Sequence, residues 1–203
     1  MKRSLRLVAL VATASAVFAA CTNNNEETTQ EQTAAPVAAK APENTMALQD
    51  TIKGSIPSEA TGKIGEANLK LTYHAPGVKG RTIWGGLVAY DQVWVTGAHM
   101  ATTLETDKAL VIGGEQIPAG KYALFTIPGR EEWTVILNKN FKQHLADNYD
   151  QQDDLVRVQV KPTTFEQHQE RLKYEINSIS GAAGNILISW DKLRIEVPVE
   201  IGS

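Results

Sequence analysis

Five side chains within residues 74–99 are the best candidates in this sequence for binding or acting on a ligand: His74, Arg81, Trp84, Trp94 and His99. An imidazole can transfer protons near neutral pH. A guanidinium can hold a carboxylate through paired hydrogen bonds, and an indole face can stack on the C–H face of a sugar. We therefore predict that these residues contribute to a ligand-binding site, with a glycan or a peptide as the ligand.

Each of these residues also has a plainer interpretation. His74 and His99 could meet in a pocket, but nothing in the sequence brings them together, which favours two separate polar residues at strand ends. The tryptophans neighbour apolar strand residues, so packing in the core is their default role. Arg81 either meets a carboxylate ligand or pairs with an internal Asp.

No assembled catalytic set is recognisable in the sequence. The G-x-S-x-G pattern of serine hydrolases is absent, and the only cysteine, Cys21, closes the first apolar run. Carboxylate pairs such as Glu105 with Asp107 arise by chance among 23 acidic residues. We therefore predict a non-catalytic ligand-binding or structural domain. The alternative is a hydrolase directed at glycans or peptides, with its site near His74, Arg81 and His99.

The sequence predicts neither a metal site nor another cofactor. Its four histidines lack the H-x-x-x-H and H-E-x-x-H spacings. The acidic residues at positions 147, 150, 153 and 154 could offer oxygen ligands to calcium, but they do not follow the order of a known loop, and a solvated turn fits them better. The glycine-rich segment 80–97 contains no phosphate loop.

Residues 1–21 have the pattern of a bacterial lipoprotein signal. MKRSLR supplies three positive charges, and LVALVATASAVFAA adds fourteen uncharged residues, too few to span a bilayer. The string FAAC, with a cysteine directly after two small residues, resembles the lipobox, although Phe18 replaces the usual Leu. We therefore expect the chain to be cut before Cys21 and Cys21 to be acylated, which makes membrane lipid the first expected partner.

This signal implies three parts: a signal peptide (1–20), a flexible tether (21–49) and a folded β domain (50–203). Residues 22–49 contain no aromatic residue and no periodic apolar pattern, so they cannot bury enough surface to offset their ordering entropy. Losing Lys2, Arg3 and Arg6 from the 20 basic side chains leaves 17 against 23 acidic ones, a net charge of −6. Nucleic acid is therefore not an expected partner. We expect a lipoprotein of a Gram-negative outer membrane, facing either the periplasm or the cell surface.

Apolar residues in the folded part recur with a period of two. They alternate with polar residues in LVRVQVK (155–161), RLKYEIN (171–177) and RIEVPVEI (194–201), which places one side of each segment in a core. QVWV (92–95) is a further strand candidate, and Gly113-Gly114 suits a hairpin turn. We predict an all-β antiparallel sandwich or barrel-like domain of about nine or ten short strands. At most one or two short helices are expected, at 139–150 and 163–170.

Three long segments carry a resemblance to a known family: GRTIWGGLVAYDQVWVTGAHMATT (80–103), GGEQIPAGKYALFTIPGREEWTVILNK (113–139) and NYDQQDDLVRVQVKP (148–162). Together they closely resemble the bacterial family called domain of unknown function 2911, over roughly residues 52–200. The resemblance implies an exported, mostly β protein, in many members a lipoprotein. It implies no established activity, substrate or cofactor.

The predicted anchor can be tested by metabolic labelling with a fatty-acid analogue. The wild-type protein should take up label, and the Cys21→Ala variant should carry none, because the thiol is the expected acceptor of the lipid. Labelled protein is detected after electrophoresis and normalised to the amount of chain. Label retained by Cys21→Ala would contradict the anchor.

Overall fold

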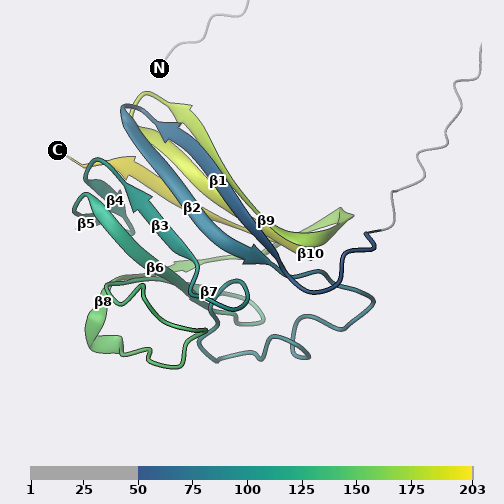
Figure 1. Cartoon of the computed structure of the whole chain (residues 1–203). Coiled ribbons are helices and arrows are strands. Elements are labelled where there is room, and N and C mark those ends of the chain that lie inside the picture. The colour runs from purple at the N-terminus through teal and green to yellow at the C-terminus, as the bar shows by residue number, and fades with distance from the viewer. Residues whose placement is uncertain (1–49, 203) are drawn as a thin grey trace, which may run out of the picture. The chain divides into compact units, whose positions relative to one another are not determined.

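The computed structural model describes residues 50–202. The predicted signal peptide and tether, with Cys21, lie outside the described residues. Ten strands and one turn of 3-10 helix make up the regular structure (Figure 1): β1 (Ile56–Ile64), β2 (Ala67–Ala75), β3 (Thr103–Thr106), β4 (Leu110–Ile112), β5 (Glu115–Ile117), β6 (Gly120–Ile127), β7 (Trp133–Asn138), η1 (Gln151–Asp153), β8 (Asp154–Val160), β9 (Thr163–Ser180) and β10 (Ala183–Ile201). Within this part of the chain, no helix is long and apolar enough to cross a bilayer.

The strands form two antiparallel sheets that face each other, with the orders β1-β2-β3-β6-β7-β8 and β5-β4-β10-β9. At one side of the sandwich β1 packs closely on β9, since a Cβ added to Gly62 would lie 2.7 Å from Ile176 Cβ. At the other side the β4–β5 turn packs on β8, since a Cβ added to Gly113 would lie 3.0 Å from Val158 Cβ. The predicted all-β antiparallel sandwich is confirmed.

The larger core fills the space between the two sheets. Leu69, Leu71 and Tyr73 of β2 contribute to it from one sheet, and Ile186 and Ile188 of β10 contribute from the other. The residues between the three β2 positions are only half-buried, so every second side chain points inward, as the period of two predicts.

A second, smaller core lies on the outer face of the six-stranded sheet. Ala123, Phe125 and Ile136 of β6 and β7 contribute to it from the sheet, and Val95 and Ala101 contribute from the β2–β3 connection. β6 and β7 are therefore buried on both faces, which explains why their sequences are nearly unbroken apolar runs. The long β2–β3 connection is fixed to the sheet by the same contacts.

Three local predictions are wrong. QVWV (92–95) is not a strand: it makes one isolated bridge, between Trp94 and Thr126, because its apolar residues pack on the second core as part of a loop. Residues 163–170 belong to β9, where the polar sequence extends a hairpin, and residues 139–150 contain no helix. The helix that is present, η1, spans three residues.

The hairpin of β9 and β10 is the longest element, with strands of 18 and 19 residues. Its register shifts on both sides of Asp191, a residue with φ of 55°, and such bulges bend a strand pair. The hairpin contacts the start of the β2–β3 connection, because Gly77 bridges to Arg171 and the Leu172 amide donates to the Pro76 carbonyl at 3.0 Å. Long-range contacts thus fix the end of the sandwich where the candidate site lies.

Close packing of β1 on β9 predicts that Gly62 tolerates no side chain. Gly62→Ala should lower the free energy of unfolding by about 1–3 kcal/mol, because the new methyl group overlaps Ile176. Urea unfolding measures the change. Lys63→Ala, at an exposed position of the same strand, is the control and should change the free energy by less than about 0.5 kcal/mol. Equal unfolding midpoints for Gly62→Ala and the wild type would contradict this packing.

Candidate functional site

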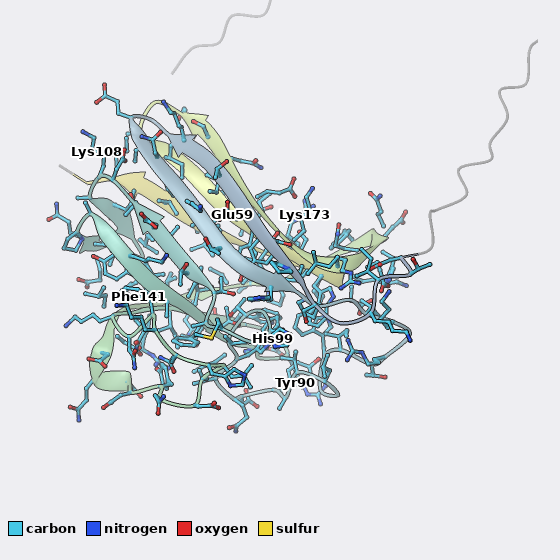
Figure 2. The ribbon with its side chains drawn as sticks, in the orientation of Figure 1. Glu59, Tyr90, His99, Lys108, Phe141 and Lys173 are labelled. Carbon is cyan, nitrogen blue, oxygen red and sulfur yellow. The ribbon has the colours of Figure 1, made fainter. Side chains whose placement is uncertain are left out.

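The β2–β3 connection, residues 76–102, carries four of the five predicted site residues. The fifth, His74, is the penultimate residue of β2. Figure 2 shows His99 and Tyr90 among the loops beyond the strand ends, whereas Glu59 lies along the sandwich. Ligand-binding residues are often carried by loops on a rigid scaffold, which is the arrangement seen here.

Thr96 fixes the backbone of this connection where it lies on the second core. It is buried and β-branched, yet its φ is 50°, a conformation that such residues rarely adopt. Its carbonyl accepts hydrogen bonds from the Tyr174 hydroxyl at 2.7 Å and the Thr102 hydroxyl at 3.1 Å, and its Oγ1 lies 3.0 Å from Thr126 Oγ1. Burial raises the pKa of Tyr174 well above its usual value, which keeps the hydroxyl protonated as a donor. Backbone strain of this kind persists only where the surroundings impose it, and it is enriched at functional sites.

All four tryptophans of the chain pack in one cluster beside this connection. The ring centroid of Trp84 lies 4.8 Å from that of Trp133 and 5.9 Å from those of Trp94 and Trp190. Trp94 stacks on Trp190, with centroids 5.7 Å apart and 17° between the ring planes. Core packing therefore takes up most of the indole surface, as the plainer interpretation of the tryptophans expects.

His74 and His99 meet in space, although the sequence favoured separate positions. Their ring centroids are 5.2 Å apart, with the planes at 74°. Burial, and then the neighbouring His99 imidazole, lower the pKa of His74, which favours the neutral form of this side chain. Within residues 50–202, neither ring forms a hydrogen bond to a carboxylate or a hydroxyl group.

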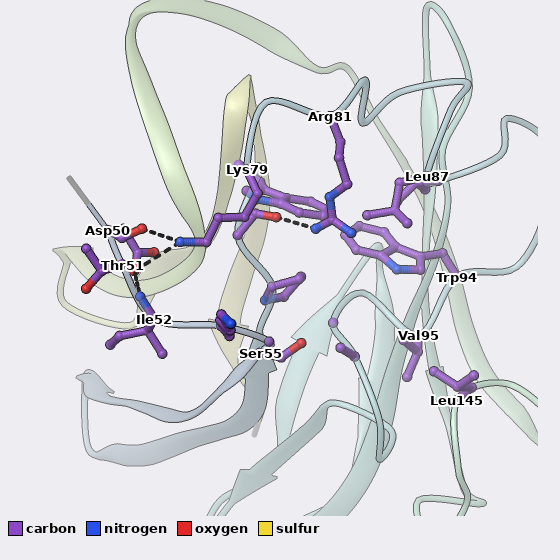
Figure 3. A pocket seen from close by; sticks show the side chains of 18 residues that line it. Asp50, Thr51, Ile52, Ser55, Lys79, Arg81, Leu87, Trp94, Val95 and Leu145 are labelled. Atoms are coloured by element: carbon purple, nitrogen blue, oxygen red, sulfur yellow. Dashed lines mark hydrogen bonds and ion pairs between the residues drawn. The ribbon is translucent and has the colours of Figure 1, made fainter.

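A pocket of about 850 Å³ opens beside these groups (Figure 3). Residues 50–55 line it together with parts of the β2–β3 connection, Leu145 and a residue of β10. Arg81 and Trp94 are the two predicted site residues that line the pocket. Trp84, His74 and His99 do not, and a Cβ added to the lining residue Gly97 would lie 3.3 Å from the His74 carbonyl oxygen. The pocket therefore unites two of the five predicted residues, and the two histidines are not among the residues that line it.

One wall of the pocket is the segment 50–55, which we call the strap. Arg171 of β9 holds it: the guanidinium binds both carboxylate oxygens of Asp50 and donates to the carbonyls of Ile52 at 2.6 Å and Gly54 at 2.5 Å. Paired hydrogen bonds of this kind between Arg and a carboxylate are short and fix the geometry of both groups. A single side chain thus ties the strap to the sheet.

Two further contacts complete this arrangement. Arg171 also donates to the carbonyl of Ala75, at the end of β2, with a distance of 3.1 Å. Lys79 forms an ion pair with Asp50, with 3.3 Å between Nζ and Oδ1. Hydrogen bonding from Arg171 holds the pKa of Asp50 well below its usual range, and Ile52 and Lys79 act in the same direction. The carboxylate is therefore ionised at any pH above about 4.

The guanidinium of Arg81 is held by backbone carbonyls. Nε donates to the Val78 carbonyl at 3.1 Å, and Nη2 donates to that of Gly77. Figure 3 shows the group projecting into the pocket between Lys79 and Trp94. No carboxylate of the described residues pairs with it, so the internal Asp that the sequence left open is absent in this part of the chain.

Three of the four acidic residues at positions 147, 150, 153 and 154 have hydrogen-bond partners that lie close to them in the sequence. Asp150 caps η1 by accepting the Gln152 amide at 2.9 Å. Asp154 accepts the Tyr149 hydroxyl at 2.7 Å and Arg157 Nη1 at 2.8 Å. Across residues 50–202, no three His, Cys, Asp or Glu side chains gather closely enough to hold a metal ion.

The fold and the pocket together define a single β-sandwich domain with a loop-covered end where a ligand site can form. Among families of known proteins, the model of the one described as "Protein of unknown function (DUF2911)" matches residues 55–199, so the chain belongs to this family. The comparisons with curated proteins and with solved structures found no match. The description of this family names no activity, substrate or cofactor.

The contacts of Asp50 predict that this side chain limits the local opening of the strap. Asp50→Asn removes the charge that Arg171 and Lys79 hold, so trypsin should cut after the exposed Lys53 several times faster than in the wild type at pH 8. Mass spectrometry of the fragments measures this cleavage. Glu66→Gln, at an exposed position in the β1–β2 turn, should leave the rate unchanged.

The same contact has a defined pH dependence. Because the pKa of Asp50 is lowered in the folded state, its stabilising effect is complete above the usual carboxyl pKa of about 4 and is lost as the pH falls through the folded-state value. The difference in Tm between the wild type and Asp50→Asn should therefore be constant from pH 6 to 8 and shrink below about pH 4. A difference that changed between pH 6 and 8, or equal cleavage rates, would contradict the role of Asp50.

Proposed function

We propose that this protein is a lipoprotein of the bacterial cell envelope whose β domain is a non-catalytic binding module, with the pocket beside the strap as its ligand site. The observation that carries the proposal is the pocket of about 850 Å³ at the end of a rigid sandwich. Sites for small ligands are concave, mostly apolar and largely preformed, with volumes of roughly 300–1,000 Å³. The volume, the apolar lining and the locked backbone at Thr96 all fit that description.

Exposed apolar side chains support the same location. Ile52, Leu87 and Leu145 are 54%, 50% and 38% exposed, and all three line the pocket. Of the described residues, only two other large apolar side chains are comparably exposed, Met100 and Ile179. Apolar surface that gathers around a concavity is typical of a binding site, whereas scattered single residues need no explanation.

The alternative, a hydrolase near His74, Arg81 and His99, has less support. Arg81 faces the pocket, but the two histidines do not line it. A general base must lie within hydrogen-bonding reach of the proton that it removes, and it is usually oriented by a third group. Within the described residues, no carboxylate orients either imidazole and no hydroxyl group hydrogen-bonds to it. Binding without catalysis therefore accounts better for this arrangement.

The envelope location rests on the sequence. The basic start, the short apolar run and Cys21 after two alanines favour export and lipid attachment. Two or three acyl chains are needed for stable anchoring, and residues 21–49 would allow a maximum reach of about 100 Å between lipid and domain. A membrane-bound module that presents one pocket to the surrounding space is the role that these features support.

A thermal-shift panel of sugars, peptides, organic acids and divalent ions tests the binding role. A ligand at 100 times its Kd stabilises the folded state by about 2.7 kcal/mol, which corresponds to a rise in Tm of about 5–10 °C for a domain of this size. Leu87→Asp should abolish the shift, because it places a charge on the apolar rim. Ile179→Asp makes the same change at an exposed apolar residue of β9 outside the pocket lining and should keep the shift.

If no compound of the thermal-shift panel raised the Tm, the result would contradict the proposed binding module. A shift that persisted in Leu87→Asp would place binding elsewhere on the domain. Turnover of a glycan or peptide by the wild type, lost in His74→Ala, would favour the hydrolase.

A further inference from the structure

We propose that the ligand of this pocket is an amphipathic carboxylate: an organic acid with an aliphatic body, whose carboxylate binds Arg81. The inference rests on the proposed function and names the class of ligand. It follows from three observations on the described lining. The oriented guanidinium of Arg81 has no ionic partner, the acidic residue Asp50 is already neutralised, and the remaining wall is mostly apolar.

Arg81 is preorganised to bind an anion. Its guanidinium has five N–H donors, and two hydrogen bonds to the carbonyls of Val78 and Gly77 fix its orientation while leaving further donors unused. No carboxylate of residues 50–202 lies within ion-pair distance of it. A planar guanidinium held in this way matches the two oxygens of a carboxylate.

The charge of the lining also favours an anion. Among the described residues that line the pocket, Asp50 is the only acidic one, and Arg171 and Lys79 already neutralise it. Lys53 and Arg81 add two positive charges that have no carboxylate partner in the described part of the chain. An anionic ligand would therefore meet attraction from Arg81 and little repulsion from Asp50.

The rest of the wall favours an aliphatic body. The lining includes five large apolar side chains: Ile52, Leu87, Val88, Trp94 and Leu145. Three of these, Ile52, Leu87 and Leu145, are exposed at the rim of the pocket. Covering such surface with an apolar group removes it from water, which favours binding. An inorganic anion would leave this surface in contact with water, so the pocket fits an acid with an apolar body better than phosphate or sulfate.

A neutral sugar fits the pocket less well. Trp94 uses one ring face to stack on Trp190, and Trp190 is only 1% exposed, so no indole pair offers two open faces to a sugar ring. Within residues 50–202, the lining has only two hydroxyl side chains, those of Thr51 and Ser55, and includes no Asn or Gln. A sugar would therefore find few side-chain hydroxyl or amide partners in this lining, whereas a carboxylate matches the guanidinium of Arg81.

Tryptophan fluorescence can test this class of ligand directly. Bromine quenches indole fluorescence on contact, and Trp94 lines the pocket at the edge of the cluster of four tryptophans. The probes are a medium-chain alkyl carboxylate with a terminal bromine and the alcohol of the same chain, both titrated into the wild-type protein below their aggregation concentrations. The carboxylate should quench with a Kd at least tenfold lower than that of the alcohol.

Variants of Arg81 and Leu87 test whether these two residues bind the carboxylate probe. Arg81→Gln should erase the preference for the carboxylate, and Arg81→Lys, which keeps the charge but not the planar group, should retain part of it. Leu87→Asp should weaken binding of the carboxylate at least tenfold, and Ile179→Asp should not. Urea unfolding of each Arg81 variant shows whether the loop contacts to Gly77 and Val78 survive, so that loss of binding is not confused with loss of fold.

The outcomes separate this inference from the proposed function. Equal affinities of the wild type for the carboxylate and the alcohol, both weakened by Leu87→Asp, would overturn the carboxylate class and leave the pocket as a ligand site. A preference for the carboxylate that survives in a folded Arg81→Gln variant would also overturn it. If neither probe quenches and the thermal-shift panel is negative, both proposals fail.

Discussion

The interaction on which the site depends is that of Arg171 with the strap. Its guanidinium, with a side chain only 15% exposed, binds a carboxylate 121 positions earlier in the chain and three backbone carbonyls. A buried cation is costly unless it is paired and hydrogen-bonded. Arg171 therefore depends on the strap for most of its partners, and the strap depends on Arg171 for its position. With the strap in place, the pocket has a wall opposite the β2–β3 connection; without it, Arg81 and Trp94 would lie on an open surface.

The sheets are the part of this structure that the sequence predicts well. Alternation in 155–161 and 194–201 identifies β8 and the end of β10, and Gly113-Gly114 forms a turn in which both residues have positive φ. The sequence did not predict β1, because its alternate positions Ser58, Ala60 and Gly62 carry small side chains and so give no alternation of large apolar and polar residues. At Gly62, β9 packs so closely that no side chain fits, and such a contact between distant segments leaves no periodic apolar signal.

The site was only partly predictable, for a related reason. Sequence analysis selected Arg81 and Trp94, which line the pocket, but it could not bring the two histidines together. Arg171 was missed altogether, because its place in RLKYEIN puts it on the polar side of an alternating strand. Its role depends on the strap, and because Asp50 lies 121 positions earlier in the chain, this contact has no local signature in the sequence.

Arg171 thus fixes one wall of the pocket, and the proposed anion site lies at Arg81 beside it. Hydrogen–deuterium exchange of the backbone amides of residues 50–55, in the wild type and in Arg171→Gln, tests the central claim most directly. The account predicts faster exchange in the variant, including at the Ile52 amide that donates to Asp50, with unchanged exchange in β2 and β10. Identical exchange of residues 50–55 in both proteins would contradict it.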